Sequence, residues 1–118
     1  MYELLQHLIA FKYACKINHW STDNYADHLL FDRLTERLDD WADSLAESYF
    51  MARDEKKVFK PDLLNPRMIS RNLVKMCEDI ISHLEELQTD DDLDEGTCSL
   101  LGDIEADFLD KLALAKLK

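Results

Sequence analysis

The organisation of the chain follows from residues 18–48, which read NHWSTDNYADHLLFDRLTERLDDWADSLAES. Ser, Thr, Asp and Asn come in succession after Trp20, and all four residue types compete for backbone groups and favour helix N-caps. We therefore expect one helix to end at about Trp20 and the next to begin at about Asn24. Apolar residues then recur at helical spacing as a single stripe: Leu30, Leu34, Leu38, Trp41, Leu45 and Tyr49. This stripe predicts one continuous helix from about Asn24 to Arg53.

Helical periodicity also covers the rest of the chain. Residues 2–20 are apolar around most of the helix circumference, as in a well-covered helix. A third helix is predicted from Pro66, because proline suits the first helical position and Asn65 suits the cap before it. A fourth helix is predicted after the acidic run at residues 89–97, and the lysines at its end suit the helix dipole: Lys111, Lys116 and Lys118.

The connection between the second and third predicted helices spans residues 54–65. Helix–helix loops in bundles are usually about 2–8 residues long. At about 3.3 Å per residue this longer segment can cover about 40 Å, which is nearly the length of the helix before it. The sequence therefore predicts an all-α fold, a four-helix bundle of ferritin-like type with a long crossover connection, and residues 1–118 as a single domain.

The composition agrees with a helical protein and restricts its partners. The chain has 118 residues, of which 47% are apolar and 33% charged, with two Gly and two Pro. A net charge of −11 opposes non-specific attraction to nucleic acid or to anionic lipid. The first helix carries too many polar groups for a membrane span. Cys15, Cys77 and Cys98 lie far apart without a CxxC motif, which is typical of reduced thiols in a cytoplasmic protein.

Four residues of the second predicted helix could bind a metal ion, namely His28, Asp32, Asp43 and Glu47. At about 100° per residue they form a stripe that points away from the apolar stripe. Asp32 and Asp43 would lie about 16 Å apart along one straight helix, so one chain could not place all four on one metal. No Ser/His/Asp set and no glycine-rich phosphate loop accompanies them, so hydrolase and nucleotide-binding functions have no support.

The same four residues are placed symmetrically along the helix. His28 and Glu47 are equally distant from a point between residues 37 and 38, and so are the two aspartates. A two-fold axis at that point would create two equivalent sites, each with the histidine and first aspartate of one chain and the second aspartate and glutamate of its mate. Imidazole with carboxylate suits Fe(II), Mn(II) or Zn(II) better than Ca(II). A solvated acidic face is the alternative, because Asp39 belongs to the same stripe.

Several segments resemble the Dps family, the mini-ferritins of starved bacteria. KINHW at residues 16–20 resembles the end of that family's first helix, and YADHLLFD at residues 25–32 resembles the FxxLHxxFD start of its second helix. DDWADSLAES at residues 39–48 is similar to the family's D-x-x-A-E-R segment. DEGTCSLLGDIEADFLDKL at residues 94–112 is similar to the GT-x-x-LL-x-D-I opening of its fourth helix. These matches occur in the family's order and cover most of the chain.

The resemblance implies a function and a set of site residues. It implies a homo-oligomeric cage, usually a dodecamer, that oxidises Fe(II) with peroxide or dioxygen and stores ferric mineral, which is ferroxidase-type oxidoreductase chemistry that protects against oxidative stress. Zn or Mn are substitutes for iron at such a site. The implied ligands are His19, His28 and Asp32 from one chain and Asp43 and Glu47 from its mate, with Trp20 beside the site. The family's Lys-rich N-terminal tail is missing here, so direct nucleic-acid binding is not expected.

Other interpretations stay open at this point. His19 and Trp20 could be core and cap residues at the end of the first helix. His7 and His83 have few acidic neighbours at useful spacing and are predicted to be surface or packing residues. The whole chain could instead be a non-enzymatic, acidic helical interaction module or DNA mimic with a decayed metal site.

Overall fold

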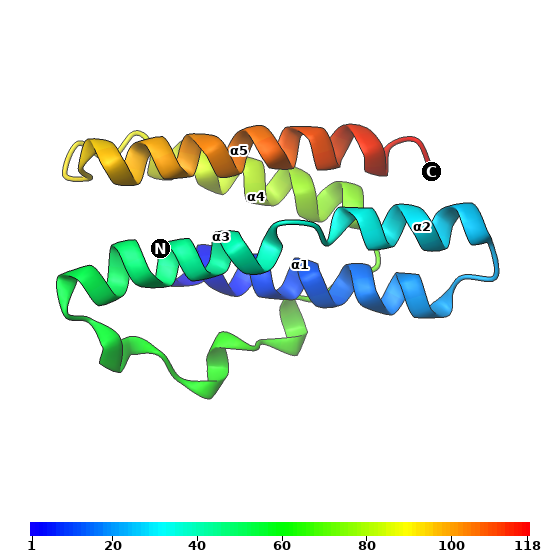
Figure 1. Ribbon diagram of the computed structural model, residues 1–118, viewed down its shortest axis with the longest axis horizontal. Helices are drawn as coiled ribbons and strands as arrows, with labels where there is room; N and C mark the ends of the chain where they lie inside the picture. Colours follow the sequence, from blue (N-terminus) through cyan, green and yellow to red (C-terminus); the bar gives the residue numbers. More distant parts are fainter.

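The computed structural model describes residues 1–118 and contains no strands (Figure 1). The five α-helices are α1 (Tyr2–Ser21), α2 (Tyr25–Leu34), α3 (Leu38–Leu45), α4 (Leu73–Leu87) and α5 (Glu95–Ala115). They run lengthwise along a molecule of 45 × 28 × 20 Å. The predicted all-α class is confirmed. No helix is both long enough and apolar enough to cross a bilayer.

Capping side chains mark the starts of α2 and α5, and α5 begins at Glu95, within the acidic run rather than after it. The side chain of Asn24 accepts a hydrogen bond from the backbone N–H of Asp27 and caps α2. Asp94 does the same for Thr97 at the start of α5, at 2.7 Å. Each cap satisfies a backbone N–H group that lacks a partner in the first turn of a helix.

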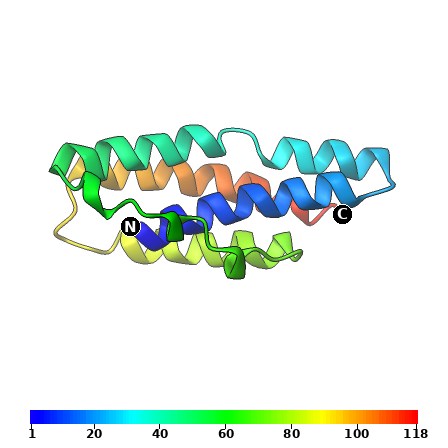
Figure 2. The ribbon, with the colours of Figure 1, turned by 90° about the horizontal axis from the view of Figure 1, so that it is seen from below.

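The predicted continuous helix from Asn24 to Arg53 is wrong, because it is broken between α2 and α3. Residues 35–37 form a turn, and Arg37 has a φ of 68°, in the left-handed region that L-residues rarely adopt. Figures 1 and 2 show the step between α2 and α3, which otherwise follow one another along the long axis. Beyond α3 the chain continues through a π-helical turn, Ala46–Phe50.

Contacts with the last helix explain why the chain breaks here without Gly or Pro. The Nζ of Lys111 donates a hydrogen bond to the carbonyl oxygen of Glu36 within the turn, at 2.7 Å. Lys111 also pairs with Asp107 at 3.2 Å, and Asp107 accepts a hydrogen bond from Nε1–H of Trp41 at 2.8 Å. The guanidinium of Arg37 lies 4.4 Å from the centre of the Trp41 ring. These contacts offset a backbone cost of about 1–3 kcal/mol for a residue in a sparsely populated conformation.

The connection to α4 is longer than predicted. Pro66 starts only a short 3₁₀ turn, Pro66–Met68, and α4 begins after Asn72, whose side chain accepts from the N–H of Lys75. The prediction of a helix from Pro66 is therefore wrong, although Asn65 does cap the short turn. Half-buried apolar residues pack this segment against the core: Val58, Phe59, Leu63, Met68 and Ile69.

The connection crosses the molecule along α1, so that α3 and α4 run in the same direction (Figures 1 and 2). Two polar contacts fix it to the first helix. The hydroxyl of Tyr2 donates to the carboxylate of Asp62, and the side-chain amide of Gln6 donates to the Asp62 carbonyl at 2.9 Å.

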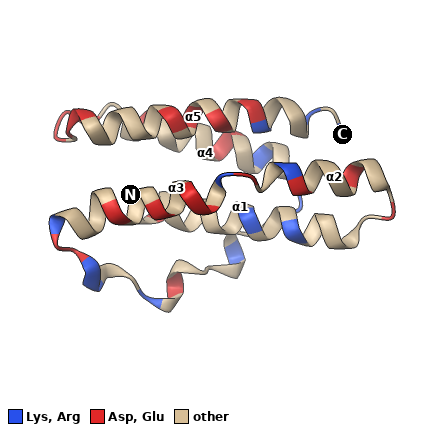
Figure 3. Cartoon of the chain, viewed as in Figure 1, with Lys and Arg blue, Asp and Glu red and all other residues tan.

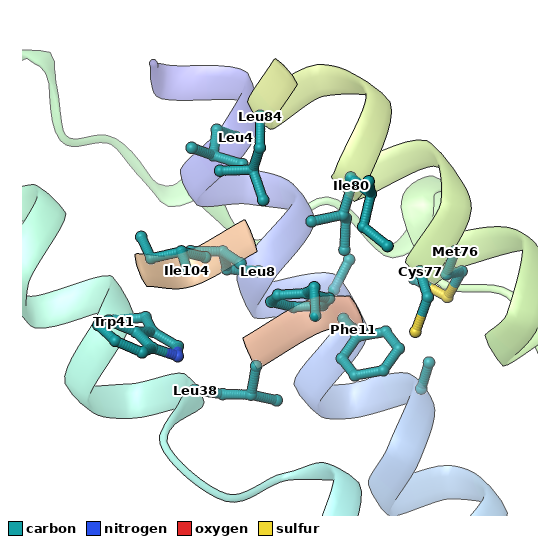
Figure 4. Packing of buried hydrophobic residues seen from close by; sticks show 14 of the residues in the cluster. Leu4, Leu8, Phe11, Leu38, Trp41, Met76, Cys77, Ile80, Leu84 and Ile104 are labelled. Atoms are coloured by element: carbon teal, nitrogen blue, oxygen red, sulfur yellow. The ribbon is translucent and has the colours of Figure 1, made fainter. Parts of the chain in front are cut away.

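One hydrophobic cluster of 23 buried residues joins the helices. Figure 4 shows Leu38 and Trp41 of α3 in the same core as Phe11 of α1 and Ile80 of α4. Leu30 and Tyr49, at the two ends of the predicted apolar stripe, are half-buried. The four residues between them are buried: Leu34, Leu38, Trp41 and Leu45. The stripe is buried on both sides of the break, so the break preserves the core.

Candidate metal centre

Two histidines lie face to face where α1 ends and α2 begins. The ring centroids of His19 and His28 are 3.6 Å apart, and the ring planes are inclined by 20°. The Nδ1 of His19 lies 2.7 Å from the carbonyl oxygen of His28, and the Nδ1 of His28 lies 2.8 Å from the carbonyl oxygen of His19. The hydrogen bonds are therefore reciprocal, and the short turn between the helices brings the two residues together.

This reciprocity determines which nitrogen carries the proton. A backbone carbonyl can only accept a hydrogen bond, so both Nδ1 atoms must be protonated. In the neutral rings the free lone pair is then on Nε2. Metal-ligating histidines commonly use this arrangement, in which the N–H opposite the metal is bound to a carbonyl or carboxylate. Both rings are half-buried, and the two hydrogen bonds hold them in one orientation.

The aromatic residues beside the histidines are at the surface. Trp20 is 69% exposed and Tyr25 is 74% exposed. Trp20 is therefore not a core residue of the single chain. The Tyr25 ring is nearly parallel to that of His28, with centroids 6.3 Å apart. Tyr25 is not among the site residues predicted from the sequence. Its position in the sequence could have indicated a place at the site, because Tyr25 directly follows the Asn24 cap and lies three residues before the candidate ligand His28.

The candidate carboxylates are distributed on the two helices that flank the break. Asp32 lies one turn after His28 on α2, and Asp43 lies on α3 one turn before Glu47 of the π-helical turn. All three carboxylates are exposed. The angles expected for a straight helix do not apply across the break. No three His, Cys, Asp or Glu side chains of one chain converge closely enough to hold a metal ion.

Electrostatic contacts distinguish these acids from a neighbour on the same helix. Asp39 of α3 pairs with Nζ of Lys12 at 2.8 Å, and this hydrogen bond raises the pKa of Lys12. Asp32, Asp43 and Glu47 take part in none of the salt bridges of the chain. Figure 3 shows acidic residues recurring along α3 and α5. The site candidates thus present carboxylates that remain free for a cation or a partner.

Lys111 is buried, contrary to the prediction from the sequence. It is 4% exposed and lies in the core, whereas the sequence places it among lysines that complement a helix end. The sequence could have indicated a buried ion pair, because Lys111 follows Asp107 by four residues and lies within an otherwise apolar stripe.

Comparison with models of protein families, with curated proteins and with solved structures gives no match to this chain.

Proposed function

We propose that the chain is the subunit of a cytoplasmic, mini-ferritin-like cage, a dodecamer by resemblance, that oxidises Fe(II) and sequesters ferric iron. The observation that carries the proposal is the reciprocal pair of hydrogen bonds between His19 and His28. Each bond uses Nδ1, and each leaves Nε2 for a metal ion. The same hydrogen bonds would also serve as caps at the helix ends, and the Fe(II) titration described below distinguishes the two roles.

The arrangement of the helices supports the proposal. If α2 and α3 are counted as one bent helix, the chain has four long elements with a crossover between the second and third. A ferritin-like bundle has such a crossover connection, which supports the proposed fold type.

The free carboxylates support a site shared between two chains. Asp43 and Glu47 are exposed and lie on the far side of the break from His28. The break itself includes residue 37, beside the midpoint of the four candidate ligands. A two-fold axis through the break would place α2 of one chain against α3 of its mate, and two equivalent sites would follow. The candidate ligands of one chain do not converge on one point, as expected if each site takes ligands from two chains.

The chemistry of this ligand set suits iron as a substrate. Imidazole and carboxylate ligands bind Fe(II), and the added carboxylate charge favours the Fe(III) product. Two Fe(II) ions supply the two electrons that convert one hydrogen peroxide and two protons into two water molecules. Paired delivery avoids release of a hydroxyl radical, which gives protection from oxidative stress.

The test is an anaerobic Fe(II) titration of the metal-free protein, followed by a pulse of peroxide and absorbance measurement of ferric-oxo species. We expect saturable binding and rapid oxidation, both lost in a variant with His28→Ala and Asp43→Ala. Asp40→Asn, which changes an exposed acid of α3, is the matched control and should retain both. Gel filtration of the same samples checks that the particle remains assembled.

An acidic interaction module is the competing function, favoured by the net charge of −11 and by the exposure of all three candidate carboxylates. It predicts a monomer or dimer on gel filtration and no Fe(II) binding above a buffer blank. Either pair of results decides between the two functions.

A further inference from the structure

A cavity with an apolar floor lies where α2, the start of α4 and the end of α5 meet (Figure 1). Its volume is about 300 Å³, at the lower limit of small-molecule pockets, which span about 300–1,000 Å³. Leu30 and Val74 form half-buried walls. The floor consists of four buried residues: Phe31, Leu34, Leu73 and Ala115. The cavity can therefore accept a small molecule with an apolar body.

Two cationic side chains stand at the mouth of this cavity. Arg71 and Lys118 are exposed, and neither takes part in any salt bridge of the chain. No Asp or Glu borders the cavity, although the chain has 25 acidic and 14 basic residues. The mouth thus carries a charge opposite to that of the molecule as a whole, which favours an anionic ligand.

Both cations keep donors available for a ligand. The ammonium of Lys118 lies 4.8 Å from the centre of the Phe31 ring, so it is held beside the apolar floor. The guanidinium of Arg71 makes one long contact, 3.4 Å, with the hydroxyl of Ser21. A guanidinium has five N–H donors, so most of those of Arg71 remain free.

The wall also contains a polar group with unused hydrogen-bonding capacity. Asn18 of α1 is only 9% exposed, and its Nδ2 donates to the carbonyl oxygen of Ala14 at 2.8 Å. Its other N–H and its Oδ1 have no partner within the chain. Buried polar groups are normally paired, so a half-paired amide that lines a cavity points to a ligand or to water.

We propose that the cavity binds a free carboxylic acid with an aliphatic body, of the medium-chain fatty acid class. The body would cover the floor, and the carboxylate would lie at the mouth between Arg71 and Lys118. A guanidinium matches the two oxygens of a carboxylate, and the unpaired N–H groups in the first turn of α4 also favour negative charge there. None of the candidate iron ligands borders this cavity.

The experiment is a calorimetric titration of the metal-free protein with octanoate, below the concentration at which octanoate forms micelles. We expect one octanoate per chain and a higher melting temperature at saturation, because a ligand of the folded state stabilises it. Octanol has the same body without the charge, and acetate has the charge without the body. Each should bind at least about tenfold more weakly than octanoate.

Variants of the mouth test the assignment of the two cations. Arg71→Gln/Lys118→Gln should weaken octanoate binding about tenfold and leave octanol binding unchanged. Arg67→Gln/Lys116→Gln is the matched control, because it removes the same charge from two exposed residues outside the cavity. The control should bind octanoate as the unmodified chain does.

Three results would overturn the proposal. The first is the absence of saturable octanoate binding, and the second is equal affinity for octanol and octanoate. The third is an equal loss of affinity in the two double variants, which would trace the effect to net charge and not to the mouth. Gel filtration at saturating octanoate adds a check on the occupant. Loss of the assembled particle there would mean that a neighbouring chain covers the cavity, and would also overturn the proposal.

Discussion

The side-chain nitrogen of Lys111 lies 2.7 Å from the carbonyl oxygen of Glu36, seventy-five residues earlier in the chain. One end of α5 therefore satisfies a backbone group that the break between α2 and α3 leaves without a helical partner. Asp107 balances the buried charge and is itself bound by Trp41.

Replacement of Lys111 by Met should destabilise the protein strongly. The side chains of Lys111 and Asp107 are 5% and 12% exposed, and removal of one partner from a buried ion pair costs about 3–5 kcal/mol because the other charge stays buried. Urea denaturation followed by circular dichroism measures the loss. Lys75→Met removes a pair with the same spacing at the exposed Asp79 and should have a far smaller effect. Equal losses in the two variants would contradict a structural role for Lys111.

The tautomer of the stacked histidines can be observed directly. Because Nδ1 of both His19 and His28 donates to a carbonyl, nitrogen-15 NMR of the metal-free protein should find protons on Nδ1 and not on Nε2 in the neutral rings. The Nε2–H tautomer is the commoner form of a free imidazole, so His83 offers an internal comparison. Observation of Nε2–H for the stacked pair would refute the geometry on which the proposed function depends.

Mixing two inactive variants should restore part of the iron oxidation. Variants His28→Ala and Asp43→Ala should each be inactive alone. If each site takes His28 from one chain and Asp43 from its mate, a mixed dimer contains one site with both losses and one site with neither. Subunits denatured together and refolded should therefore recover activity, up to about a quarter of that of the unmodified protein for random pairing. No recovery from correctly assembled mixtures would mean that the ligands do not belong to a shared site.

The three thiols should differ in reactivity with pH. Burial raises the pKa of Cys77 to about 12 and raises that of Cys15 as well, whereas Cys98 is half-exposed. The thiolate is the reactive form, so iodoacetamide at pH 8 should modify Cys98 first. Mass spectrometry of peptides gives the order. Rapid labelling of Cys15 in the folded protein would contradict its burial.

The same raised pKa values predict how stability depends on pH. In the unfolded chain these thiols ionise at about pH 8.5, whereas in the folded protein Cys77 stays neutral up to about pH 12. The unfolded state therefore binds fewer protons between these values. The thiols contribute their full stability below about pH 8.5 and lose it progressively toward pH 12. Cys77→Ser should reduce this dependence, because a serine hydroxyl does not ionise in this range.

The helical content and several helix ends could be predicted because their causes are local. The caps formed by Asn24 and Asp94 act within three residues, and the apolar stripe through Leu34 and Leu45 repeats at the helix period. The candidate ligands could be selected for the same reason, because residue type and spacing along one helix are visible in the sequence. Whether they form one site requires a second chain, which spacing alone suggests but does not demonstrate.

By itself, therefore, the sequence determined the helical class, the local caps and the apolar faces, all of which arise from interactions between residues a few positions apart. Only the tertiary structure decided where the second helix breaks, since the decisive contact to Glu36 comes from Lys111 on a distant helix. It also decided that His7 meets His83, through the packing of α1 on α4. Such contacts depend on which helix faces are buried against each other, and periodicity identifies a face without naming the residues that will oppose it.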